Sequence, residues 1–183
     1  MSSPVRIMGI DPGLQHTGYG IIDVHHHQTR YVSHGVIHTR AADSLSQRLF
    51  TLFAQLCDVF KTFCPQEVSV EDIFVNTNGR STLKLGMARG VVLMAPSQYN
   101  LPVYEYSANC VKKAVVGAGH ATKEQVAKMV GHLVRIPKDA QEKSVVPEHG
   151  KTLFPAGDGA DALAVALCHA HFRTVTMLDK KYG

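Results

Sequence analysis

The chain has 183 residues, 45% of them hydrophobic, which suits one domain with a hydrophobic core. No apolar tract is long enough to span a membrane, no signal peptide is visible, and the four cysteines lack the spacing of a disulfide framework, so we expect a cytoplasmic protein with reduced thiols. The net charge of +4 is unevenly distributed: residues 76–138 carry nine Lys and Arg against two Glu, a net +7 that favours a nucleic-acid partner over a merely solvated surface.

Short strands are predicted throughout the first two thirds of the chain. Val5 to Asp11 is an apolar run that ends in an acid and is followed by Pro12-Gly13, which is typical of a buried strand delivering Asp11 to its carboxyl end. The first three strands are close enough in sequence to form antiparallel hairpins. After the first, strands are expected near residues 17–24, 30–38, 67–72 and 102–106.

Helices are predicted between and after these strands. Ser44 and Gln47 form a capping-box pattern at the start of a helix that ends at Phe63, before Pro65. The chain, residues 1–183, is therefore expected to form a single α/β domain with a five-stranded mixed sheet flanked by helices. Further helices are expected at about residues 80–95, 107–116, 122–135 and 158–172, with an irregular loop at about 137–157.

Four carboxylates could meet in such a domain. Asp11 and Glu71 lie at or near the ends of two predicted strands, and Asp158 and Asp161 open a helix with an i, i+3 spacing that directs both side chains to one side. Carboxylates placed close together repel one another, which destabilises the folded protein unless bound divalent cations balance their charges. Taken singly, each acid has an ordinary explanation as a turn residue, a solvated strand residue or a helix N-cap, and only the combination points to a site.

The combination resembles the RuvC-type Holliday junction resolvases of the ribonuclease H-like superfamily. The resemblance extends from Val5 to about Phe172 and implies an endonuclease that resolves four-way DNA junctions by paired symmetric nicks, in recombination and DNA repair. It also implies a homodimer, because a twofold junction matches a twofold enzyme, and a branch-migration partner of the RuvA-RuvB type. The motifs that carry it, in order, are GIDPG, GYG, VEDIFVNTNGRSTLKLGMARG, PVYEYSANCVKKAVVGAGHATKEQV and DGADALAVALCHAH.

The acids indicate which metal such an enzyme would use. Carboxylate and water ligands suit Mg²⁺, with Mn²⁺ able to substitute, and two ions about 4 Å apart can activate water and stabilise a leaving oxygen. We expect two ions in each subunit, with Asp11 between them, Glu71 on one, and Asp158 and Asp161 on the other. The histidines are not expected to form a zinc site, since no four converge with suitable spacing.

Residues that contact DNA are predicted from charge and from the resemblance. Within the resemblance, Lys112 and Lys123 match DNA-contacting lysines, and Phe74 matches an aromatic wedge that opens the crossover. A Phe after a strand is also commonly a core residue. The basic surface adds further candidates from its exposed helices and loops: Arg80, Lys84 and Lys113.

Two other interpretations are possible from the residues alone. Asp11-Pro12-Gly13 could be the first phosphate loop of an actin-like ATPase, but 183 residues are too few for the two domains of that fold. The chain could also bind junctions without cutting them, although a protein that only binds DNA would not need all four acids. The predicted helix at 80–95 carries an apolar stripe, and the resemblance implies that this segment helps to pair two subunits. The stripe could equally pack inside one domain, and both roles could hold on opposite faces. Its members are Leu83, Met87, Val91 and Met94.

Overall fold

A computed structural model describes residues 3–26, 28–72, 79–136 and 157–182 of the chain. Phe74 and nearly all of the loop predicted at 137–157 lie outside these residues. The elements are β1 (Val5–Asp11), β2 (His16–His25), β3 (Gln28–His38), α1 (Leu45–Phe63), β4 (Glu67–Asp72), α2 (Gly79–Met94), the 3-10 helix η1 (Ala95–Tyr99), β5 (Val103–Ser107), α3 (Ala108–Val116), α4 (Lys123–Val134) and α6 (Asp158–Tyr182).

The five strands form one mixed sheet, as predicted, and their order in it is β3-β2-β1-β4-β5. The first three strands pair antiparallel, whereas β1 pairs with β4, and β4 with β5, in parallel. Parallel neighbours have their carboxyl ends at the same edge of a sheet, so β1, β4 and β5 all end together. That edge carries the predicted acids of β1 and β4.

The helices begin and end close to the predicted positions. Ser44 caps α1 with the capping box expected from the sequence, and Thr122 and Gln125 form a second capping box at the start of α4. The last helix is longer than predicted, because α6 continues to Tyr182 rather than ending near residue 172.

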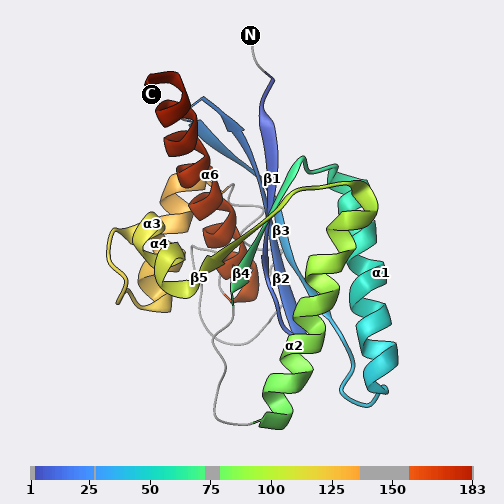
Figure 1. Cartoon of the computed structure of the whole chain (residues 1–183). Coiled ribbons are helices and arrows are strands. Elements are labelled where there is room, and N and C mark those ends of the chain that lie inside the picture. Colours follow the sequence, from blue (N-terminus) through green and yellow to red (C-terminus); the bar gives the residue numbers. More distant parts are fainter. Residues whose placement is uncertain (1–2, 27, 73–78, 137–156, 183) are drawn as a thin grey trace.

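Helices cover both faces of the sheet. Figure 1 shows α1 and α2 on one side, and α6 with α3 and α4 on the other. Each face has its own hydrophobic core, and strand alternation decides which residues join it. Ile7 and Ile22 pack toward α6, while Met8, Ile10 and Val70 pack toward α1 and α2.

Glycines in the sheet allow α6 to approach closely. A Cβ atom added at Gly9 would lie 2.1 Å from the carbonyl oxygen of Ala162, and one added at Gly18 would lie 1.9 Å from that of Asp158. No larger residue fits at either position without moving the helix. The first turn of α6 is therefore held directly against the end of β1 and the start of β2.

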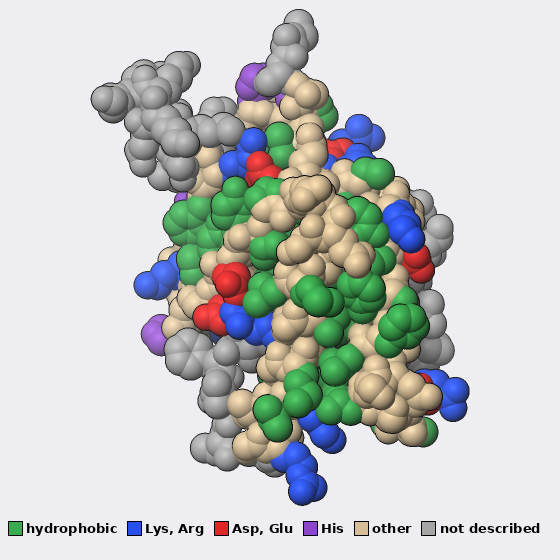
Figure 2. Space-filling model, turned by 45° about the vertical axis from the view of Figure 1, so that its right-hand side comes forward, with side chains coloured by type: hydrophobic (Ala, Val, Ile, Leu, Met, Phe, Trp, Pro, Cys, Tyr) green, Lys and Arg blue, Asp and Glu red, His purple; other side chains and the backbone are tan. Residues whose placement is uncertain are grey.

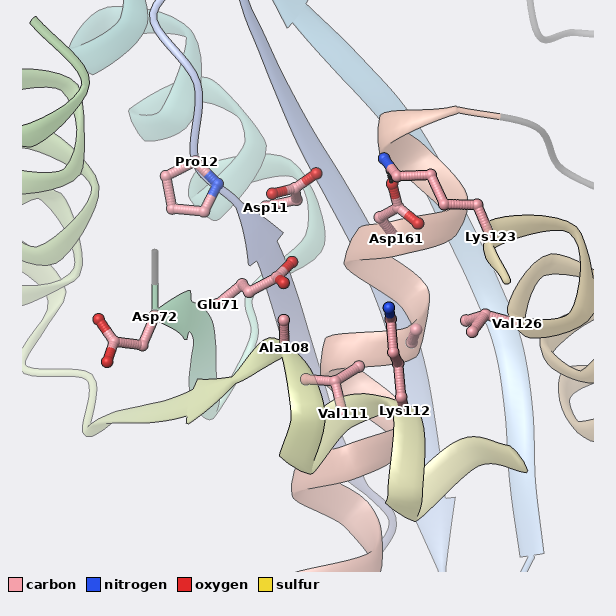
Figure 3. A pocket seen from close by; sticks show the side chains of 11 residues that line it. Asp11, Pro12, Glu71, Asp72, Ala108, Val111, Lys112, Lys123, Val126 and Asp161 are labelled. Carbon is pink, nitrogen blue, oxygen red and sulfur yellow. Dashed lines mark hydrogen bonds and ion pairs between the residues drawn. The ribbon is translucent and has the colours of Figure 1, made fainter. Parts of the chain in front are cut away.

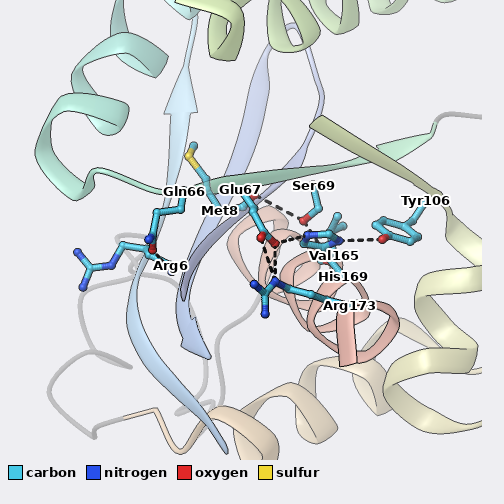
Figure 4. Close-up of polar contacts among 9 residues, drawn as sticks. All are labelled: Arg6, Met8, Gln66, Glu67, Ser69, Tyr106, Val165, His169 and Arg173. Atoms are coloured by element: carbon cyan, nitrogen blue, oxygen red, sulfur yellow. Dashed lines mark hydrogen bonds and ion pairs between the residues drawn. The ribbon is translucent and has the colours of Figure 1, made fainter. Parts of the chain in front are cut away.

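A polar network fixes α6 at the opposite end of the sheet (Figure 4). Arg173 donates through Nε to both carboxylate oxygens of Glu67, at 2.9 and 3.0 Å, and the His169 ring contacts Glu67 at 2.9 Å and the Tyr106 hydroxyl at 2.8 Å. Burial raises the pKa of Glu67, but the hydrogen bonds from His169 and Arg173 outweigh it and leave that pKa below its ordinary value. His169 is buried and His171 exposed, so this pair diverges as predicted.

The stripe predicted on α2 is largely exposed. Leu83, Met87 and Met94 are accessible in the isolated chain, while Val91 is half-buried against the core. Figure 2 turns this side of the molecule forward and shows hydrophobic side chains gathered over it. Among the described residues, no helix combines the length and the apolar character needed to cross a membrane.

Candidate active site

The four predicted carboxylates meet at the carboxyl edge of the parallel strands. Ile10 pairs with Val70, so the next residue along each strand sets Asp11 beside Glu71, and both side chains face α6. Asp158 and Asp161 lie in the first turn of α6, on the side that meets the sheet. One oxygen each of Asp11, Asp158 and Asp161 lie within 4.8 Å of one another.

The electrostatics of Asp11 reflect this crowding. The pKa of Asp11 is raised from 3.8 to about 8, first by burial and then by the negative charges of Glu71, Asp161 and Asp158, while Lys123 opposes the shift. The pKa of Glu71 is also raised, first by burial and then by Asp161. Without a cation, the cluster therefore holds a proton near neutral pH, which is the behaviour expected of ligands assembled for a positive ion.

Two lysines complete the pocket (Figure 3). The pocket has a volume of about 290 Å³, and Lys112 of α3 and Lys123 of α4 line it together with Asp11, Glu71 and Asp161. The Lys123 ammonium donates to Asp161 Oδ2 at 3.0 Å, and this hydrogen bond raises the pKa of Lys123. Its side chain is 79% exposed, so it remains accessible from solvent.

The other predicted DNA-binding residues lie outside the pocket. Arg80 and Lys84 are exposed on α2, and Lys113 is exposed on α3, one residue from Lys112. Phe74 lies outside the described residues, so its predicted wedge role stays a prediction.

Two features of this site were not predicted from the sequence. Lys123 was expected to face DNA, and its ion pair with Asp161 could not be inferred from spacing. Asp72 also borders the pocket, but its carboxylate points away from Asp11 and Glu71 and forms an ion pair with Arg89 of α2 (Figure 3). Its position directly after Glu71 was the only available signal.

The donor set is suited to hard divalent cations. Asp11, Glu71, Asp158 and Asp161 offer only carboxylate oxygens, and no histidine or cysteine joins the cluster among the residues that the structure describes. Oxygen ligands of this kind favour Mg²⁺ or Mn²⁺ over zinc. A bound cation would also offset the repulsion from Glu71, Asp161 and Asp158 that contributes to the raised pKa of Asp11.

The pKa of Asp11 predicts how the stability of the metal-free protein depends on pH. Because this pKa is raised from 3.8 to about 8, the folded state holds the proton more tightly than the unfolded state does. The stabilisation that comes from protonated Asp11 is fully present below about pH 4. It decreases as the pH rises and is lost once the pH passes about 8. Above that pH, the wild-type protein should carry the full repulsion of the cluster.

Asp11→Asn should remove this dependence. At about pH 8.5 in EDTA, we expect its melting temperature to exceed that of the wild type by roughly 5–10 °C, and at about pH 4 the difference should nearly vanish. Calorimetry at both pH values checks this, and Mg²⁺ should stabilise the wild type more than the variant. A constant difference at both pH values would contradict the assignment.

Over most of its length, the chain is similar to one family of known proteins. The family model described as "Crossover junction endodeoxyribonuclease RuvC" matches residues 7–169. Proteins with that name from Bartonella quintana and Paramagnetospirillum magneticum are 44% and 48% identical over 174 and 169 residues, covering 95% and 92% of this chain and 94% and 93% of theirs. The structure of Thermus thermophilus RuvC with a Holliday junction substrate matches with a TM-score of 0.79 at 32% identity, covering 94% of this chain and 96% of that one. A yeast mitochondrial Holliday junction resolvase, at 15% identity and a TM-score of 0.70 over 97% of this chain and 82% of its own, supports the fold alone.

Proposed function

The chain belongs to the RuvC family of crossover junction endodeoxyribonucleases, with a ribonuclease H-like fold, and we propose that its pocket resolves four-way DNA junctions by paired nicks in two strands of like polarity. The observation that carries the proposal is the meeting of Asp11, Glu71, Asp158 and Asp161, from three separate segments, beside two lysines. This activity would serve recombination and DNA repair in the cytoplasm.

We infer that the four acids hold two Mg²⁺ ions in each subunit, for which Mn²⁺ can substitute. When bound, the ions would activate water and stabilise the leaving oxygen of an in-line displacement at phosphorus. The chain's own contribution is to hold the acids rigidly: Asp11 and Glu71 on neighbouring strands, and Asp158 and Asp161 on a helix packed against Gly9 and Gly18. Rigid elements of this kind preserve the geometry that catalysis requires.

Lys112 and Lys123 would neutralise the DNA backbone at the pocket. Both line it from the helical side, and Lys123 is exposed enough to turn from Asp161 to a phosphate. Arg80, Lys84 and Lys113 would extend this contact over the surface, each adding to the salt dependence of binding. Phe74 would open the stacked crossover as an aromatic wedge.

Two subunits would act on one junction. The exposed stripe of Leu83, Met87 and Met94 on α2 is an apolar surface suited to pairing with a second copy. A homodimer would set two pockets on a twofold junction, one for each strand. A branch-migration complex of the RuvA-RuvB type is the further partner we propose.

An assay on synthetic DNA tests the proposed function. With Mg²⁺, a four-way junction labelled on each strand in turn should yield symmetric nicks in one pair of strands, with 5′-phosphate and 3′-hydroxyl ends that a ligase can seal. A linear duplex of the same sequence is the matched control and should stay intact. Equal cutting of junction and duplex would indicate an unselective nuclease, and binding without cutting would indicate a junction-binding protein.

A further inference from the structure

Arg89 of α2 joins the end of β4 to the middle of β5 on the face of the sheet that α2 covers. Its Nη2 atom lies 3.0 Å from Oδ1 of Asp72 on β4, and it also contacts Oε2 of Glu105 on β5. The Arg89 side chain is 30% exposed, and its Nε atom is buried. One guanidinium therefore holds two carboxylates from neighbouring strands, and it attaches both strands to the same helix.

Strand alternation connects this contact to Glu71. The Ser69 hydroxyl donates to the carbonyl oxygen of Val165 in α6, at 3.3 Å, whereas Val70 packs in the core beneath α1 and α2. Glu71 therefore faces α6, like Ser69, and Asp72 faces α2, like Val70. Figure 3 shows Asp72 pointing away from the Asp11 and Glu71 carboxylates.

We propose that Arg89 is a positioning residue for Glu71, acting through Asp72 and Glu105; the inference rests on the proposed function. Without the guanidinium, the two carboxylates would repel each other across neighbouring strands. The end of β4 would shift to relieve that repulsion, and Glu71, one residue earlier, would move with it. Small displacements of a catalytic group cost large factors in rate.

Arg6 provides a matched control within the same sheet. It also pairs with a carboxylate on a neighbouring strand, Asp23, at 2.7 Å, and its side chain is 34% exposed. It donates to the carbonyl oxygen of Phe63 as well, so it likewise links the sheet to a helix. However, Arg6 lies near the start of β1, at the opposite end of that strand from Asp11.

Arg89→Met and Arg6→Met should therefore differ at the pocket while losing similar thermal stability. For Arg89→Met, we expect single-turnover cleavage of a four-way junction to fall by about 10-fold or more, and the affinity of the DNA-free protein for Mn²⁺, measured by calorimetry, to fall by about 5-fold or more. Junction binding in EDTA should stay within about 2-fold of wild type. Arg6→Met should match wild type in all three measurements, and equal pocket defects in both variants would overturn the proposal.

A charge-balanced variant tests the cause. Arg89→Met combined with Asp72→Asn and Glu105→Gln removes the guanidinium and both carboxylates, so the repulsion disappears and cleavage and Mn²⁺ affinity should return to within about 3-fold of wild type. No recovery would overturn the proposed route through Asp72 and Glu105. If wild type does not cut junctions but Mn²⁺ affinity follows the expected pattern, the proposed function fails and the positioning role of Arg89 stands.

Discussion

Asp11→Asn, Glu71→Gln and Asp161→Asn should each reduce junction cleavage by about 10³-fold or more while leaving junction binding intact or tighter. Each substitution keeps the size of the side chain but removes one of the charges needed to hold divalent cations. The remaining acids cannot compensate, because the three come from different elements and each faces the pocket from its own direction. Removing a negative charge also reduces repulsion of the phosphate backbone, so binding should not weaken.

Single-turnover cleavage in Mg²⁺ and junction binding in EDTA measure the two effects separately. Asp58→Asn is the matched control, since Asp58 is an exposed acid on α1 that pairs only loosely with Lys61, at 3.9 Å, and does not line the pocket. It should match the wild type in both assays. A pocket variant that cuts within about 3-fold of wild type would show that its acid is not a required ligand.

Backbone geometry explains why the acid cluster could be predicted from the sequence. Asp11 follows an apolar run, and Glu71 lies near the end of another, so a parallel pairing of those strands was sufficient to bring them together. Asp158 and Asp161 lie on one side of α6, as their i, i+3 spacing predicts, because helical periodicity is a local property of the chain. Local pattern also predicted the capping box of Ser44.

The contacts of Lys123 and Arg89 could not be predicted in this way. Lys123 reaches Asp161 across 38 positions of sequence, and Arg89 reaches Glu105 across 16. Such pairs depend on how separate elements pack and on which rotamers long side chains adopt, which no periodicity in the sequence encodes. The predicted end of the last helix, near residue 172, was also too early, since α6 continues to Tyr182.

The proposed dimer leads to the second large effect. A heterodimer of wild type and Asp161→Asn would contain one complete pocket and one that binds DNA but lacks a metal ligand. Because each pocket is built from the acids of one chain, the mutant site cannot borrow a carboxylate from its partner. Such a heterodimer should nick one strand of a junction and stop.

A supercoiled plasmid with an extruded cruciform distinguishes the outcomes. One nick relaxes the circle, whereas two paired nicks linearise it, so purified wild-type dimers should give mostly linear DNA and heterodimers mostly nicked circles. Heterodimers would be purified by a different affinity tag on each subunit. A heterodimer of wild type and Asp58→Asn, purified in the same way, is the control, and it should linearise the plasmid like the wild type. Mostly linear product from the Asp161→Asn heterodimer would mean that a single pocket serves both strands, and the model of one pocket for each strand would then be wrong.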